Sequence, residues 1–106
     1  MHYTVVEEVP TGVVVTVGMF LVNKHPAIVL FDSGASHSFM SQAFASRNDQ
    51  KVIEVSNGGY SISLAEATIS TNKIVRDMLI SIPEREYTMD LIVLPRLSID
   101  VILGMR

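Results

Sequence analysis

Short runs of β-branched and apolar residues, each bounded by turn-forming residues, recur along this chain of 106 residues. The first two runs, Val13–Val17 and Ala27–Phe31, enclose the polar stretch Asn23–Pro26, whose proline cannot donate to a β-ladder. This pattern predicts a hairpin of two core strands. Further runs of the same kind are 51–55, 60–64, 74–82, 89–94 and 99–103. Many short strands at turn-marked spacing predict an all-β fold, either a small barrel or a sandwich.

A second hairpin is predicted around the tetrapeptide Ser56-Asn57-Gly58-Gly59, which lies between the runs 51–55 and 60–64. Asn-Gly between two alternating segments is the strongest short-range hairpin signal, because both residues tolerate the left-handed backbone of a type I′ turn. We expect this hairpin to be partly exposed.

One short helix is predicted over residues 38–47. Phe39, Ala43 and Phe44 fall at helical intervals there, and Ser36 or Ser38 is placed to cap the first turn.

Composition restricts the classes of partner. A hydrophobic content of 48% and a mean hydropathy of +0.36 indicate one folded domain over residues 1–106. The net charge of −3, without a basic cluster, gives no support for nucleic acid or an anionic membrane as a partner. The chain has no cysteine, and His2, His25 and His37 lack metal-ligand spacing, so we expect no disulfide, no metal site and no cofactor.

The chain is expected to be soluble and to have no targeting segment. No apolar run approaches the ~20 residues of a membrane span. Glu7 and Glu8 stand where a signal peptide would carry positive charge.

Asp32 is the strongest candidate for a catalytic residue. It follows the apolar run Ala27–Phe31 and precedes Ser33 and Gly34, so a carboxylate is placed beside a glycine at the edge of the core. Carboxyl groups are rarely held there unless they are paired or used. The alternative is an ordinary β-turn, since Asp, Ser and Gly are all favoured turn residues.

Two other readings of nearby residues are weaker. His37 lies between Ser36 and Ser38, but the segment lacks the closing glycine of a serine-hydrolase nucleophile elbow. Asp100 could supply a second carboxylate, but an aspartate at the start of a strand beside a solvent loop is more simply structural, and we leave it out of the site.

The segment Leu30-Phe31-Asp32-Ser33-Gly34-Ala35-Ser36-His37-Ser38-Phe39 resembles the active-site segment of retropepsin-like aspartic proteases, especially those of plant gypsy-type LTR retrotransposons. A second block, 90–95 followed by 99–105, is similar to the family's closing segment, whose apolar-apolar-Gly lies against the catalytic loop. The resemblance implies a small closed acid-protease β-barrel with one short helix and one lobe per chain. Members of the family continue into a C-terminal helix, which residues 1–106 do not contain.

The resemblance also implies a mechanism. Metal-free peptide hydrolysis requires one group to take a proton from water and another to give a proton to the carbonyl oxygen, and two adjacent carboxyls sharing one proton do both. Since the chain holds one Asp-Ser/Thr-Gly, the second Asp32 would come from an identical subunit, making a homodimer that cleaves an extended peptide or polyprotein. A retroelement origin suggests a cytoplasmic location.

Further roles follow from the resemblance, residue by residue. The active-site support would be Ser33, Gly34, Ala35 and Ser36, with Ser33 bonding across the dimer. The tip of a flap over the substrate would be Asn57, Gly58 and Gly59. The substrate pocket and closing strand would be Ile99, Val101, Ile102, Leu103 and Gly104.

Two alternatives from other classes stay open. The chain could be a catalytically silent, retrotransposon-derived module for dimerisation or peptide binding, in which Asp32 is unused. It could also be a monomeric β-barrel binding protein, which would not self-associate at high concentration.

Overall fold

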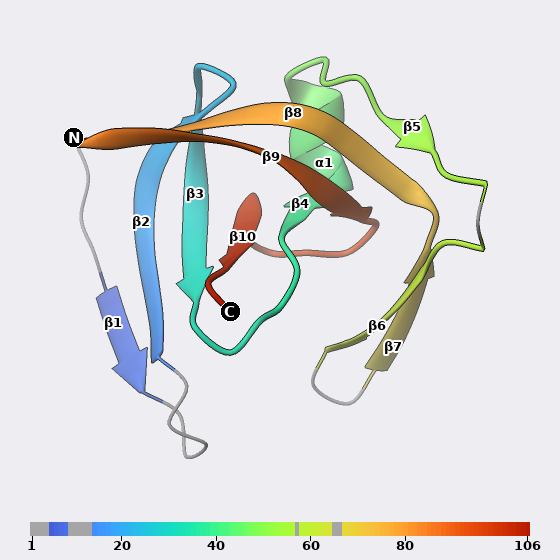
Figure 1. The fold of residues 1–106 in the computed structure, drawn as a ribbon, viewed down its shortest axis with the longest axis horizontal. Helices are drawn as coiled ribbons and strands as arrows, with labels where there is room; N and C mark the ends of the chain where they lie inside the picture. The colour runs from blue at the N-terminus through green and yellow to red at the C-terminus, as the bar shows by residue number, and fades with distance from the viewer. Residues whose placement is uncertain (1–4, 9–13, 57, 65–66) are drawn as a thin grey trace.

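The computed structural model describes residues 5–8, 14–56, 58–64 and 67–106. Its elements, shown in Figure 1, are β1 (Val5–Glu8), β2 (Val14–Val22), β3 (His25–Asp32), β4 (Phe39–Ser41), α1 (Gln42–Arg47), β5 (Ile53–Glu54), β6 (Tyr60–Leu64), β7 (Ala67–Thr71), β8 (Lys73–Ile82), β9 (Arg85–Leu94) and β10 (Val101–Gly104). Within these ranges no helix is long and apolar enough to cross a membrane.

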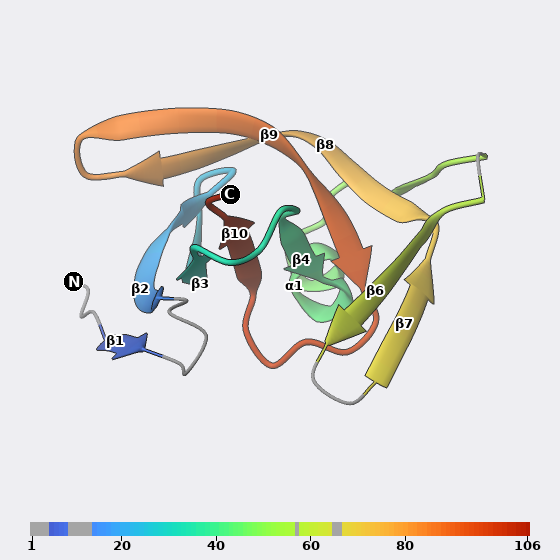
Figure 2. The same cartoon turned by 60° about the horizontal axis from the view of Figure 1, so that its bottom comes forward.

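Six strands close into a barrel in the order β2-β3-β10-β4-β9-β8, and β8 pairs back onto β2. Strand β10 lies between β3 and β4, parallel to the first and antiparallel to the second, as Figure 2 shows. The predicted all-β class, the closed barrel and the single short helix are therefore confirmed for the described residues.

The predicted first hairpin is present. Strands β2 and β3 pair in antiparallel register from Val15↔Asp32 to Val22↔His25. Asn23 and Lys24 form the turn with φ of 50° and 70°, as a two-residue type I′ loop requires. The turn is thus tighter than expected, and β3 includes His25.

The prediction of a second hairpin paired the wrong strands, because the runs 51–55 and 60–64 do not pair with each other. Strand β5 pairs with β8, through Ile53↔Ile74, and β6 pairs with β7, through Ile62↔Ile69. Asn57 lies outside the described residues. Pairing with β8 brings Ile53 to the apolar cluster that contains Ile74, a long-range gain that outweighs the local turn preference.

The helix is shorter than predicted and begins later. Residues 39–41 pair with β9 and β10 as strand β4, so the helix starts only at Gln42. Its N-cap is Ser41, neither Ser36 nor Ser38, and the Phe44 N–H donates to the Ser41 hydroxyl at 3.0 Å.

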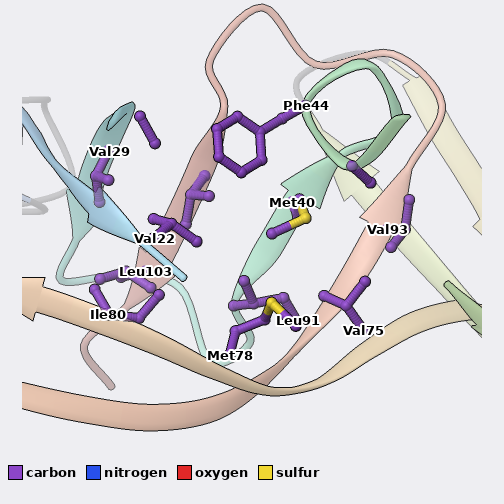
Figure 3. Close-up of a cluster of buried hydrophobic side chains, with 13 residues drawn as sticks. Val22, Val29, Met40, Phe44, Val75, Met78, Ile80, Leu91, Val93 and Leu103 are labelled. Atoms are coloured by element: carbon purple, nitrogen blue, oxygen red, sulfur yellow. The ribbon is translucent and has the colours of Figure 1, made fainter. Parts of the chain in front are cut away.

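Two apolar clusters support the site. The larger cluster fills the barrel, where Phe44 of α1 meets Met40 of β4 and side chains of β2, β3, β8, β9 and β10 (Figure 3). The smaller cluster contains Phe39, Ile92 and Leu94, with Tyr60 and Ile62 of β6 packed against it. This second cluster anchors the β6–β7 hairpin to the barrel.

Candidate active site

Asp32 is the last residue of β3, at the start of the loop that leads to β4 (Figure 1). The register pairs it with Gly104 of the parallel strand β10. Its side chain is half-buried, and the Gly34 N–H donates to its Oδ1 at 2.9 Å. This contact across two residues fixes the carboxyl group at the mouth of the loop.

The residues at the end of β10 and directly after it bind the loop through their backbone. The Met105 N–H donates to the backbone oxygen of Asp32 at 2.9 Å, and the Arg106 N–H donates to that of Ala35 at 3.2 Å. A Cβ on Gly104 would lie 2.6 Å from the Ala35 oxygen and would also overlap the His37 oxygen. Only glycine therefore allows this strand and the loop to approach so closely.

A cavity of about 360 Å³ opens beside Asp32. Loop residues and β4 form one wall and β6 forms the other. The lining residues are Asp32, Gly34, Ala35, Ser36, His37, Phe39, Ser61, Ile62 and Ser63. Asp32 is the one carboxyl group among these lining residues, so a single described chain supplies one carboxylate to this cavity.

The β6–β7 hairpin projects from the barrel on the same side as this loop (Figure 1). Within the part of the chain that the structure describes, β6 pairs only with β7. Residues 61–63 of β6 line the cavity. The backbone of a strand with an unpaired edge can accept an extended peptide by β-strand addition.

Two of the three predicted flap residues, Gly58 and Gly59, are described by the structure, and they do not lie at the tip of this hairpin. Gly58 and Gly59 precede β6, at the end of the hairpin opposite the Leu64↔Ala67 pair. Their φ values are 91° and 77°, so both adopt the left-handed backbone. They turn the chain from the barrel into β6, and the expectation that they form a hairpin tip is wrong.

The predicted closing strand does lie against the loop, but it does not line the cavity that contains Asp32. Val101 is fully buried in the barrel core, and Ile102 packs against the smaller cluster. Leu103 and Gly104 line a different, apolar cavity of about 340 Å³. Ile99 precedes the strand and is half-buried. None of these strand residues lines this cavity in the single chain, and their assignment to the substrate pocket stays a prediction.

Several lining residues were missed by sequence reasoning. His37 Nδ1 and the Ser36 hydroxyl oxygen are hydrogen-bonded at 3.1 Å. The His37 ring lies edge-on to the Tyr60 ring, with the two ring centroids 6.5 Å apart. Phe39 and Ile62 add apolar lining. The alternation of polar and apolar residues across both 60–64 and 67–71 was the available signal for this hairpin.

Asp100 has a structural partner at each oxygen. Its Oδ2 accepts the Ile28 N–H at 2.8 Å, and its Oδ1 accepts from Arg47 of α1 at 3.2 Å. It links the start of β10 to β3 and to the helix, in agreement with its exclusion from the site.

The closed six-stranded barrel, with one strand beside an Asp-Ser-Gly loop and a cavity between that loop and a projecting hairpin, is consistent with a small retropepsin-like domain. The chain belongs to the retroviral aspartyl protease family, whose model matches residues 2–106. A search of curated proteins found no match to the chain.

Proposed function

We propose that this chain is an aspartic endopeptidase whose catalytic centre consists of two Asp32 carboxyls, one from each of two identical subunits. The observation that carries the proposal is that Asp32, in the chain's one Asp-Ser-Gly, is the one carboxyl group lining the cavity beside the catalytic loop. Because acid and base catalysis by carboxyls requires two of them, one lobe is half of a site.

The two carboxyls share one proton, since like charges a few Å apart do not both ionise readily. The ionised carboxylate takes a proton from water, and the oxygen of that water attacks the scissile carbonyl carbon while the protonated carboxyl donates to the carbonyl oxygen. The tetrahedral intermediate then collapses: the C–N bond breaks as one carboxyl gives its proton to the leaving amine, and the other carboxylate takes a proton from a hydroxyl of the intermediate, which restores the shared proton of the dyad. The Gly34 N–H, which already donates to Asp32 Oδ1, orients the carboxyl for this exchange.

The substrate is an extended peptide segment, such as a junction in a retrotransposon polyprotein processed in the cytoplasm. It adds as a strand along β6, whose residues 61–63 line the cavity opposite the catalytic loop. The β6–β7 hairpin then acts as the flap that excludes water. Ser33, exposed on the loop, contacts its counterpart across the two-fold axis, and Ala35 and Ser36 border the substrate.

Cleavage of an unfolded protein by the concentrated parent and by Asp32→Asn, compared from mildly acidic to neutral pH, tests this function. We expect cleavage by the parent only, because the amide of Asn cannot act as a base. Circular dichroism serves as the control that both proteins are folded. Cleavage by Asp32→Asn at a rate near that of the parent would reject the mechanism, and folded parent protein without activity would favour a silent dimerisation or peptide-binding module.

A further inference from the structure

Ser38 is a residue of the catalytic-loop motif to which the proposed function gives no role. It is half-buried between the loop and β4. Its backbone oxygen accepts the Ile92 N–H of β9 at 2.9 Å, and its hydroxyl accepts the Gly104 N–H of β10 at 3.0 Å. One residue thus joins the loop to two strands of the barrel.

The hydroxyl contact completes a series of three. The consecutive N–H groups of Gly104, Met105 and Arg106 donate to the loop at the Ser38 hydroxyl, the Asp32 oxygen and the Ala35 oxygen. Two of these acceptors are backbone atoms, which every residue type provides. The Ser38 hydroxyl is the acceptor in this series that depends on a side chain.

The position of Gly104 in turn affects Asp32. Gly104 is paired with Asp32 in the parallel ladder, and the next N–H, that of Met105, donates to the Asp32 oxygen. The loop lies so close to Gly104 that a Cβ would overlap the oxygens of Ala35 and His37. A shift of Gly104 toward the loop therefore meets these oxygens and moves the loop that carries the carboxyl.

We propose that Ser38 is a positioning residue, whose hydroxyl holds the Gly104 amide and thereby sets the place of the Asp32 carboxyl. This inference rests on the proposed function. A half-buried N–H that loses its acceptor must find another, and the strand end shifts toward one. Because displacement of a catalytic group by about 1 Å lowers turnover by about a hundredfold, loss of the hydroxyl reduces kcat and leaves KM nearly unchanged.

The test compares Ser38→Ala, Ser38→Thr and Ser38→Val in cleavage of one peptide substrate. Thr and Val have the same shape, so any effect of added bulk is common to both, and only Thr keeps the acceptor. We expect kcat to fall at least about tenfold in Ala and Val and to stay within about threefold in Thr, with KM similar throughout. Should Val fail to fold, the comparison of Ala with Thr gives the same answer. An unchanged kcat in Ser38→Ala would overturn the inference while leaving the proposed function intact.

A second measurement does not depend on activity. Hydrogen exchange of the Gly104 amide, followed by NMR, should be slow in the parent and in Ser38→Thr and faster in Ser38→Ala. Equal exchange rates in the parent and Ser38→Ala would overturn the inference. Faster exchange in Ser38→Ala, together with a parent that cleaves nothing, would reject the proposed function and with it the effect on turnover.

Discussion

At the scale of single residues, the site depends on how closely two backbone segments approach each other. The Gly104 N–H donates to the Ser38 hydroxyl, and the N–H groups of Met105 and Arg106 donate to backbone oxygens of the same loop. No room remains for a side chain at the glycine. Every aspartate provides a carboxyl group, whereas the fixed place of the Asp32 carboxyl at the cavity is a consequence of this contact.

Gly104→Ala is expected to reduce the free energy of unfolding by at least about 2 kcal/mol, because the new methyl group meets backbone oxygens that cannot rotate away. Gly58→Ala is the matched control, since its Cβ would meet nothing within 4 Å and only the left-handed φ of 91° opposes it, at about 1 kcal/mol. Urea unfolding measures both. A smaller loss at Gly104 than at Gly58 would contradict the close approach of loop and strand.

At the scale of elements, the stability of the short helix α1 depends on its N-cap and its packing more than on its length. Six residues are too few for a stable isolated helix. Ser41 is 3% exposed and accepts the Phe44 N–H, and Phe44 itself is fully buried in the larger cluster. The helix therefore packs against the barrel core beside β4, the strand that follows the catalytic loop.

Ser41→Ala should lower stability by about 1 kcal/mol, because a buried helix N–H loses its acceptor. Ser46→Ala, in the same helix but exposed, removes only a surface hydrogen bond from Gln42 and should change stability by less than about 0.5 kcal/mol. Thermal and urea unfolding of the two variants provide the comparison. Equal losses in both would show that capping at Ser41 is unimportant.

The positions of many strands could be predicted from the sequence, but the pairing partners of some strands could not. Runs such as 74–82 and 89–94 are strands because their β-branched and apolar residues fit a pleated, half-buried surface. The Asn57-Gly58 dipeptide misled the assignment because a local turn preference is weak compared with burial of Ile53 beside Ile74 in the smaller cluster.

At the scale of the whole molecule, one barrel supplies one carboxyl to its cavity, so the proposed mechanism predicts that activity requires two copies of the chain. A heterodimer that contains one Asp32→Asn subunit has one carboxyl and should be inactive. Mixing the parent with an excess of the inactive variant therefore tests whether the catalytic centre is shared.

An about ninefold excess of Asp32→Asn should lower parent activity about tenfold, since random exchange leaves few dimers with two intact carboxyls. The same excess of an unrelated folded protein is the control for competition at the substrate. Parent activity unaffected by the variant, after time for subunit exchange, would indicate a catalyst that works as a monomer.

Dilution gives a second expectation for the dimer. Specific activity of the parent should fall as the protein is diluted, because the shared site separates into inactive halves. Sedimentation velocity over the same concentrations should show the dimer being replaced by monomer. Constant specific activity while the sedimenting species changes to monomer would contradict a shared site.

The strand-rich class, the first hairpin and the choice of Asp32 as the candidate catalytic residue could all be predicted from the amino-acid sequence, because they depend on local patterns of residue type and on a short motif. The three-dimensional fold was needed to show that β5 pairs with β8, that β6 forms a wall of the cavity and that Val101 is buried in the core. Strand partners and cavity walls depend on contacts between residues far apart in the chain, where burial of apolar side chains outweighs local turn and helix preferences.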